Sequence, residues 1–368
     1  MAAERFELKH PRGVTRVVAG AGALAGAMEE LAPRLAGRAL FAVSSAPVLA
    51  LHGDALAPLA GAARSFRILE VPDGEPAKCV AEAGRLWSAL AAGGAKRDSV
   101  VAAFGGGTVG DLAGFVAATY LRGVEVVQLP TTLLAQVDAA IGGKTAIDLP
   151  EAKNAVGAFH HPSWVVADAG WLPTLPAEEL RSGLVEAVKT AALLDAGLLG
   201  RIERDLERLL AAEPAALGPV AAAAARAKAK LVESDPEEAG ARALLNLGHT
   251  LGHALETAAG YGRLRHGDAV AHGLRFVLRL AAPRGLEPGY GPRLEALLDR
   301  LAVPPLPPLA VPALLELIAR DKKARESGLT WVLPLAPGRA ELTAGIPEAE
   351  VAARLAEWLP GQTAAGPL

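Results

Sequence analysis

Short runs of β-branched and aromatic residues alternate with segments rich in Ala and Leu throughout the first half of the chain. These runs predict strands over 14–18, 39–43, 66–71, 100–104, 124–129 and 164–167. Strands separated by helices favour a mainly parallel sheet with helices on both faces, because parallel neighbours need long crossover connections. We therefore expect an α/β domain with a Rossmann-like sheet, in which ligands bind beyond the carboxyl ends of the strands.

From about residue 175 the alternation ends, and apolar residues recur at helical spacing over 176–194, 198–212 and 220–231. A proline-rich connector, 303–312, precedes one more helical segment and a strand-like run over 329–333. A chain of 368 residues is longer than one hydrophobic core usually supports. The pattern predicts two domains, an α/β domain over 1–174 and a mainly α-helical, metal-binding domain over 175–368.

The amino-acid composition and charge of the chain argue against several classes of function. The formal net charge of -3 and the lack of a long Lys/Arg block argue against nucleic acid or an anionic membrane as a partner. No apolar stretch is long enough for a membrane span, and we expect no signal peptide. The single cysteine, Cys79, excludes an internal disulfide and a cysteine-based metal site, so we expect a cytoplasmic protein.

A glycine run, Gly105, Gly107 and Gly110, follows the predicted strand 100–104 directly and opens a helix near Val109. Glycines permit positive φ and close backbone approach, and a helix N-terminus favours the negative charge of a pyrophosphate. The alternative is a tight strand-to-helix turn. In the usual Rossmann layout the run follows the first strand, whereas here it follows the fourth, so the acidic partner of a ribose is sought elsewhere, for example in 72–75.

Four of the eight histidines fall between His249 and His272. His249 and His253 are four residues apart, which places them on one helical face, suited to a metal or a proton relay. With no cysteine nearby, a carboxylate is the expected third ligand, and Glu186 stands in an otherwise apolar helical stretch where an unpaired charge is costly. Spacing alone leaves several ligand sets open, including His249 and His253 with Glu186 or Asp268.

Taken together, these segments resemble the 3-dehydroquinate synthases, over about 72–334. The motifs that carry the resemblance are PDGEPAK at 72, GGGTVGDLAGFVAATYLRG at 105, PTTLLAQVDAAIGGKT at 130, KNAVGAF at 153, LVEAVK at 184, ALLNLGHTLGHALE at 243, RHGDAV at 265 and RDKK at 320. The resemblance implies a homodimeric lyase that uses NAD and Zn²⁺ or Co²⁺.

The resemblance also implies residue roles. The metal ligands are Glu186, His249 and His266, which leaves His253 as a proton or phosphate partner. Residues of the reaction itself are Asp138, Lys144, Lys189 and His253. Further substrate contacts are Arg122, lent across a dimer interface, and Asn154, Lys228, Arg242, Asn246 and one of Lys322 and Lys323. NAD contacts are Asp73, Glu75, Lys78, Gly105, Gly106, Gly107, Thr108, Val109, Gly110, Asp111, Thr131, Thr132, Lys144, Lys153, Trp171, Leu172 and Thr174.

The implied reaction converts a phosphorylated sugar acid, 3-deoxy-arabino-heptulosonate 7-phosphate, to 3-dehydroquinate and phosphate. It proceeds by transient oxidation, β-elimination of phosphate, re-reduction and aldol closure. Two alternative hypotheses for the function are a cyclase that acts on a sedoheptulose phosphate and a metal-dependent polyol dehydrogenase. The sequence departs from the family pattern at Ala140, Ala146, Asp148 and Thr190, none of which is a proposed ligand. It also departs at His160 and His161, beside the KNAVGAF run, and at Asp268, where Glu is usual, and these departures bear on local geometry or metal choice.

Overall fold

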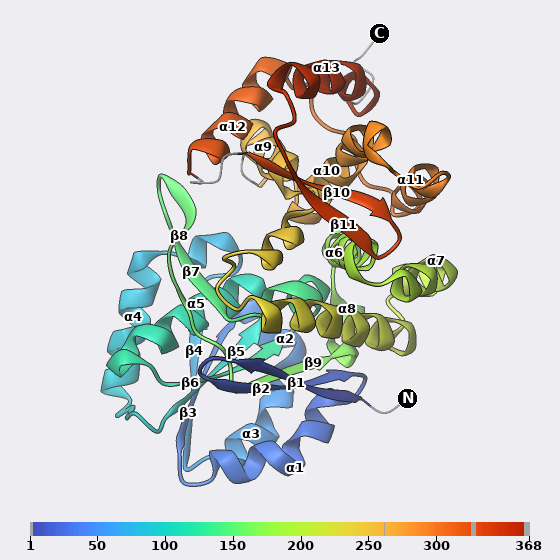
Figure 1. Ribbon diagram of the computed structural model, residues 1–368. Helices are drawn as coiled ribbons and strands as arrows, with labels where there is room; N and C mark the ends of the chain where they lie inside the picture. Colours follow the sequence, from blue (N-terminus) through green and yellow to red (C-terminus); the bar gives the residue numbers. More distant parts are fainter. Residues whose placement is uncertain (1–2, 261, 325–328, 364–368) are drawn as a thin grey trace. The chain divides into compact units, whose positions relative to one another are not determined.

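The computed structural model (Figure 1) describes residues 3–260, 262–324 and 329–363, with only the backbone of 321–324. Its contacts divide the chain into two compact units. The sheet unit is Met1–Leu180 with Glu207–Glu237, and the helical unit is Arg181–Leu206 with Glu238–Leu368. The chain therefore returns once to the sheet unit after leaving it, whereas the sequence suggested one boundary after residue 174.

A seven-stranded sheet forms the centre of the sheet unit, in the order β1-β2-β9-β6-β5-β3-β4. All neighbours are parallel except β1 and β2, which form an antiparallel hairpin at one edge. The six strands predicted in the first half are confirmed, and β1 is the one strand of this sheet that was not predicted. The strands are β1 Glu4–His10, β2 Gly13–Gly20, β3 Ala39–Ser45, β4 Ser65–Val71, β5 Val100–Gly105, β6 Glu125–Pro130 and β9 Trp164–Asp168.

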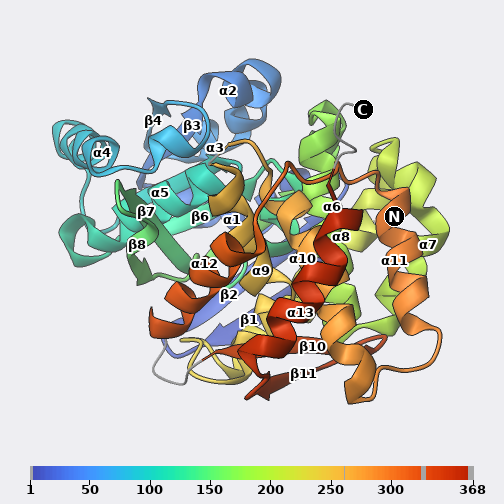
Figure 2. The ribbon, with the colours of Figure 1, turned by 90° about the horizontal axis from the view of Figure 1, so that it is seen from above.

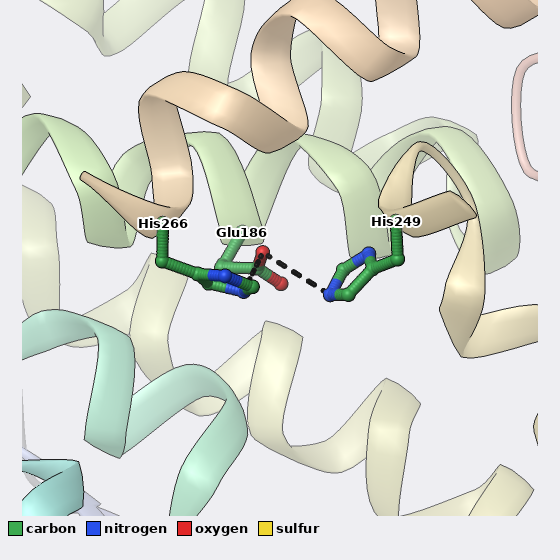
Figure 3. A group of neighbouring side chains, drawn as sticks. All are labelled: Glu186, His249 and His266. Carbon is green, nitrogen blue, oxygen red and sulfur yellow. Dashed lines mark ion pairs between the residues drawn. The ribbon is translucent and has the colours of Figure 1, made fainter. Parts of the chain in front are cut away.

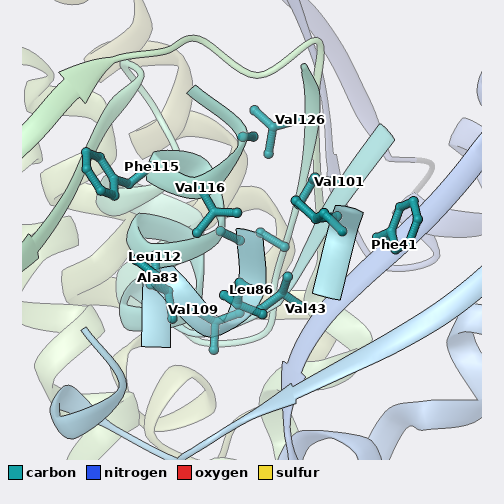
Figure 4. Packing of buried hydrophobic residues seen from close by; sticks show 14 of the residues in the cluster. Phe41, Val43, Ala83, Leu86, Val101, Val109, Leu112, Phe115, Val116 and Val126 are labelled. Carbon is teal, nitrogen blue, oxygen red and sulfur yellow. The ribbon is translucent and has the colours of Figure 1, made fainter. Parts of the chain in front are cut away.

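Central strands are buried on both faces, as a parallel sheet requires. In β3, Phe41 and Val43 point to one face and pack with side chains of α4 and α5 (Figure 4), whereas Leu40 points to the other face with α1 and α3. Alternate side chains of one strand thus join two separate cores. The helices are α1 Ala23–Leu35, α2 Ala46–His52, α3 Ala57–Ala62, α4 Val80–Ala92 and α5 Gly107–Thr119.

Helix α8, Pro214–Ser234, also belongs to the sheet unit, although it follows the predicted boundary. Its alanines Ala222, Ala225 and Ala229 pack against Val17 and Ala19 of β2. Small side chains let the helix lie close to the strands. A second hairpin, β7 Lys144–Leu149 and β8 Ala152–Phe159, was not predicted and packs against α5.

The helical unit contains α9 packed against α10 and α12, with α13 against α10 and α12 (Figure 2). The predicted helix 176–194 is confirmed as α6, and the strand-like run 329–333 as β10 of a hairpin with β11. The elements of the helical unit are α6 Ala177–Leu194, α7 Ala196–Leu210, α9 His249–Ala259, α10 His266–Ala281, α11 Tyr290–Arg300, α12 Val311–Ala324, β10 Thr330–Ala336, β11 Arg339–Ala344 and α13 Glu348–Trp358. The first residues of α6 and the last residues of α7 belong to the sheet unit.

Short helical turns also occur among the described residues: η1 Gly53–Leu56, η2 Glu75–Ala77, η3 Tyr120–Arg122, η4 Ala135–Ala139, η5 Ala169–Thr174, η6 Ala241–Asn246, η7 Ala282–Arg284 and η8 Leu359–Gly361. Of these, η4 is a π-helical turn. Among the described residues, no helix combines the length and apolar character that crossing a membrane requires.

Candidate active site

The carboxyl ends of neighbouring parallel strands bring several predicted cofactor residues to one edge of the sheet. The Ser45 hydroxyl at the end of β3 donates to Oδ1 of Asp73, which follows β4, over 2.9 Å. The backbone N–H of Thr131, after β6, donates to the carbonyl of Gly105, at the end of β5, over 2.9 Å. The Thr108 hydroxyl donates to Glu75 over 3.3 Å. Segments far apart in sequence therefore form one polar edge.

The glycine run lies between β5 and α5 as predicted, but its glycines are needed for packing. None of Gly105, Gly106, Gly107 and Gly110 has a positive φ, so the run does not use the left-handed backbone that glycine permits. A Cβ on Gly105 would lie 2.7 Å from Val109, and one on Gly110 would lie 2.9 Å from an oxygen of Gln128. The first turn of α5 can therefore follow β5 closely, with its N–H groups directed out of the helix end.

Lys78 is the centre of a polar cluster on this unit. Its Nζ donates to Oδ2 of Asp111 over 2.9 Å and to Oδ1 of Asn154 over 2.5 Å. Asp148 lies 4.0 Å from the same ammonium group and accepts the backbone N–H of Asn154 over 2.7 Å. Burial lowers the pKa of Lys78, but the carboxylates of Asp111, Glu75 and Asp148 outweigh it, so the net shift is upward. Lys78 therefore remains charged.

Asn154 has φ of 54°, in the left-handed region, which an asparagine tolerates better than most residues. Because Lys78 and Asp148 hold its side chain and its backbone, the β7–β8 hairpin is fixed at the residue that the family resemblance assigns to substrate. Asp148 stands where Asn is common in the family. Here its carboxylate lies near the Lys78 ammonium group and accepts the backbone N–H of Asn154.

A second pair of predicted substrate residues also meets on the sheet unit. Lys228 of α8 donates to Oδ1 of Asp138 over 2.5 Å and to the carbonyl of Asp138 over 2.7 Å. Asp138 lies on the π-turn η4, a type of turn frequent at functional sites. Side chains from η4 and α8, 90 residues apart in sequence, are thus paired.

The other predicted residues of the sheet unit vary in exposure. Lys144 and Arg122 are exposed, and Arg122 has φ of 67° in η3. The Lys153 ammonium group lies 3.5 Å from Glu75. Trp171 and Leu172 are buried. Thr174 is exposed, and its hydroxyl lies 2.8 Å from Nε2 of His52. Lys322 and Lys323 lie in α12, but their side chains fall outside the described residues.

In the helical unit, Glu186, His249 and His266 converge (Figure 3). The Nε2 atoms of His249 and His266 lie 3.9 and 3.5 Å from Oε1 of Glu186, and one ligand atom from each residue lies within 4.8 Å of the others. Two imidazoles and one carboxylate are a common donor set for a catalytic divalent metal. Glu186 is fully buried, and its Oε2 lies 2.5 Å from Nζ of Lys189.

Two glycines beside His249 and His266 allow three helices to meet here. Gly248, with φ of 78°, precedes His249 at the start of α9, and a Cβ on it would lie 3.0 Å from the carbonyl of Val270 in α10. Gly267 follows His266, and a Cβ there would overlap the backbone of Ser182 in α6. The Gly267 N–H donates to the Ser182 hydroxyl over 3.0 Å. Close contacts at glycine thus bring both histidines to Glu186.

The surroundings shift the pKa values of the two histidines in opposite directions. Burial lowers the pKa of His249 well below 6.5, and the charge of Lys189 lowers it further. Burial also acts to lower the pKa of His266, but hydrogen bonds to Glu186 and Glu256 outweigh it and raise the pKa to about 10. The Nδ1 atom of His249 lies 3.1 Å from the carbonyl of Leu247. A neutral His249 would therefore carry its proton on Nδ1 and turn the Nε2 lone pair toward Glu186.

Comparisons with known proteins identify the family of the chain. Residues 68–182 match the family model described as "3-dehydroquinate synthase N-terminal", and residues 183–324 match the model described as "3-dehydroquinate synthase C-terminal". The chain belongs to the 3-dehydroquinate synthase family. Relatives named 3-dehydroquinate synthase include one from Geobacter metallireducens, 47% identical over 81% of this chain and 83% of that one. Another, from Symbiobacterium thermophilum, is 47% identical over 82% of this chain and 85% of that one.

Solved structures of related enzymes share the fold. A 2-epi-5-epi-valiolone synthase from Streptomyces hygroscopicus with NAD⁺ and Zn²⁺ bound is 30% identical, covers 94% of this chain and 97% of its own, and has a TM-score of 0.86. A 2-deoxy-scyllo-inosose synthase complexed with carbaglucose-6-phosphate, NAD⁺ and Co²⁺ is 24% identical, with a TM-score of 0.87 over 97% of this chain and 100% of its own, which is a likeness of fold.

Other residues that the family resemblance assigns to the site also lie in the helical unit. His253 is exposed, and its ring centroid lies 5.4 Å from that of His249. Arg242 is buried in η6, and Asn246 ends the same turn. Lys189 is buried beside Glu186, one helical turn away. The unit therefore gathers cationic, amide and imidazole groups within a few elements.

Asp268 and Glu256 show what sequence reasoning missed. Asp268 is buried and accepts two hydrogen bonds from Arg181, of 2.8 and 3.2 Å. The carboxylate beside Nδ1 of His266 is instead Glu256, at 3.1 Å. Glu256 is seven residues after His249 and three after His253, so the helical spacing that identified the histidines also placed Glu256 on their side of α9.

Proposed function

We propose that the protein is a 3-dehydroquinate synthase. It would convert 3-deoxy-D-arabino-heptulosonate 7-phosphate to 3-dehydroquinate and phosphate by transient oxidation, β-elimination, re-reduction and intramolecular aldol closure. The observation that carries the proposal is the convergence of Glu186, His249 and His266 in a chain of this family. As a lyase of this kind, the enzyme would depend on both NAD and a divalent metal.

The sheet edge suits a dinucleotide. The N-terminus of α5 directly follows β5, and the backbone N–H groups of a helix N-terminus suit the negative charge of a pyrophosphate. The carboxylates of Asp73 and Glu75 would accept hydrogen bonds from ribose hydroxyls. NAD, when bound, would accept a hydride from the substrate and return it within one turnover.

The donor set of Glu186, His249 and His266 suits Zn²⁺ or Co²⁺, which accept nitrogen and oxygen ligands. With three protein ligands, a metal keeps positions for substrate oxygens, and there it would act as a Lewis acid. Lys189 lies beside Glu186 and could hold a substrate hydroxyl from the same helix.

The remaining polar groups would recognise the two ends of the substrate. Lys144, Asn154, Asn246 and His253 would bind the phosphate group, and Arg242 and Lys228 the carboxylate. Asp138, which accepts from Lys228 at 2.5 Å, would orient a hydroxyl near that lysine. Because the substrate's own phosphate oxygen can take the neighbouring carbon-bound proton, the protein needs to supply little base.

Arg122 extends the proposal to the oligomer. It is exposed, and the family resemblance assigns it to substrate contact across a dimer interface. We propose a homodimer in the cytoplasm, with the phosphorylated sugar acid as its small-molecule partner.

Purified protein supplied with the heptulosonate phosphate, a sedoheptulose phosphate and a simple polyol tests the proposal. We expect phosphate release from the first substrate only, with bound NAD required, no net NADH and loss of activity in chelator. Release from the sedoheptulose phosphate instead would favour the other cyclase, and net NADH from the polyol would favour a dehydrogenase.

A further inference from the structure

His266 has a carboxylate beside each ring nitrogen. Its Nε2 lies 3.5 Å from Oε1 of Glu186, and its Nδ1 lies 3.1 Å from Oε1 of Glu256. The side chain of Glu256 is 15% exposed and that of Glu186 is fully buried. The two neighbours are therefore unequal, one deep in the unit and one nearer its surface.

A neutral imidazole has one N–H and one lone pair, so its two nitrogens cannot both bind a cation. An ionised carboxylate only accepts hydrogen bonds. We infer that Glu256 is a positioning residue, which takes the Nδ1–H of His266 and thereby directs the Nε2 lone pair to a metal held with Glu186 and His249. The inference rests on the proposed function, since it assumes that this group holds the metal.

Glu256 would act on His266 as the backbone acts on His249. The carbonyl of Leu247 lies 3.1 Å from Nδ1 of His249, and both arrangements leave Nε2 facing Glu186. A carboxylate that accepts the Nδ1–H also makes the imidazole more basic and therefore a stronger metal ligand. Asp268, two residues after His266, is instead paired with Arg181, which donates to both of its oxygens.

A different use of Glu256 is also geometrically open. Ligand atoms of His253, Glu256 and His266 lie within 4.8 Å of one another, so these residues could hold an ion of their own. That ion would use Nδ1 of His266 and would compete with the metal at Nε2 for the one lone pair of the ring. The buried Glu186 favours the first group, and metal stoichiometry distinguishes the two.

The test compares Glu256→Ala and Glu256→Gln with the matched control Glu316→Gln, which changes a carboxylate that is 68% exposed on α12. Each protein is stripped of metal and titrated with Co²⁺ against a chromogenic chelator, and the visible Co²⁺ spectrum is recorded. Urea unfolding of the metal-free forms shows whether each variant folds. No substrate is needed for these readouts.

We expect one Co²⁺ per chain in every protein. Affinity should fall by about 10- to 100-fold in Glu256→Ala, less in Glu256→Gln, whose amide oxygen still accepts from Nδ1, and not in the control. The Co²⁺ spectrum should change in Glu256→Ala, because the ring is no longer oriented.

Unchanged affinity in a folded Glu256→Ala, or two Co²⁺ per wild-type chain with one lost in that variant, would overturn the inference. Phosphate release by the wild-type enzyme is measured separately. If release is normal while Glu256→Ala binds metal normally, only the role of Glu256 fails. If the loaded wild type releases no phosphate while affinity depends on Glu256, only the proposed function fails.

Discussion

The Nζ atom of Lys189 lies 2.5 Å from Oε2 of Glu186, and both side chains are buried. Removing one member of a buried ion pair usually costs roughly 3–5 kcal/mol, because the other charge loses its compensation. Glu186→Gln should therefore lose metal and also destabilise the metal-free protein. Metal analysis and urea unfolding in chelator measure the two effects.

A double variant separates these effects. Glu186→Gln with Lys189→Met removes both charges, so stability should recover toward the wild-type value while metal binding stays lost. If the double variant is no more stable than the single one, the ion pair is not the source of the destabilisation.

His249 and His253 lie four residues apart on α9 but differ in burial: His249 is 9% exposed and His253 is an exposed residue. His249→Ala should reduce bound Zn²⁺ well below one per chain. His253→Ala should keep Zn²⁺ and slow phosphate release. Metal analysis and phosphate-release assays on both variants check this, and equal metal loss in both would make His253 a ligand.

The fold was predictable where burial dictates residue type. Strands such as β3 and β5 are buried on both faces and read as apolar runs, so their positions in the sequence were evident. β1 was missed because it is an edge strand with Glu4, Arg5, Glu7 and Lys9 on it, and such charges are typical of edges. The placement of α8 depends on which surface its alanines cover, which spacing along one helix does not reveal.

The sequence predicted which types of residue form the candidate site, but it did not predict which of these residues contact one another. A carboxylate in an apolar helix and a cluster of histidines pointed to Glu186 and His249 without fixing the third ligand. Gly248 and Gly267 decide which helices meet, through close contacts that exist only in three dimensions. The contact between Glu256 and His266 was not predicted, because a glutamate on a helix is ordinarily a solvated side chain.

Asp148 holds the backbone N–H of Asn154 at 2.7 Å, while Lys78 holds the Asn154 side chain. Asp148→Ala should free this residue, whose φ of 54° is otherwise unfavourable, and raise KM about tenfold, as for the loss of roughly one hydrogen bond to a charged group. Asp148→Asn keeps an acceptor oxygen and should act nearly as wild type. Steady-state phosphate release gives KM for both.

Glu151→Ala, at an exposed position of the same hairpin, serves as the control for the Asp148 variants. A KM in Asp148→Ala equal to that of the control would show that Asn154 is positioned without Asp148, or does not contact the substrate.

His272 is buried, with Nε2 2.9 Å from the carbonyl of Pro304 and Nδ1 3.3 Å from Oε1 of Gln362. Burial lowers its pKa below the ordinary value of 6.5. Below pH 6.5 the unfolded chain therefore binds a proton more readily than the folded one. The contribution of His272 to stability is complete above that pH and is lost as the pH falls toward the folded pKa.

His272→Gln tests this linkage, because an amide can donate to the Pro304 carbonyl and does not titrate. Relative to the wild type, its free energy of unfolding should gain up to about 1.4 kcal/mol per pH unit as the pH falls below the ordinary histidine pKa. Urea unfolding in chelator, from about pH 8 to about pH 5, compares the two proteins without a contribution from metal release. Parallel stability curves over that range would mean that His272 takes up no extra proton on unfolding, and the loss of stability in acid would then belong to other groups.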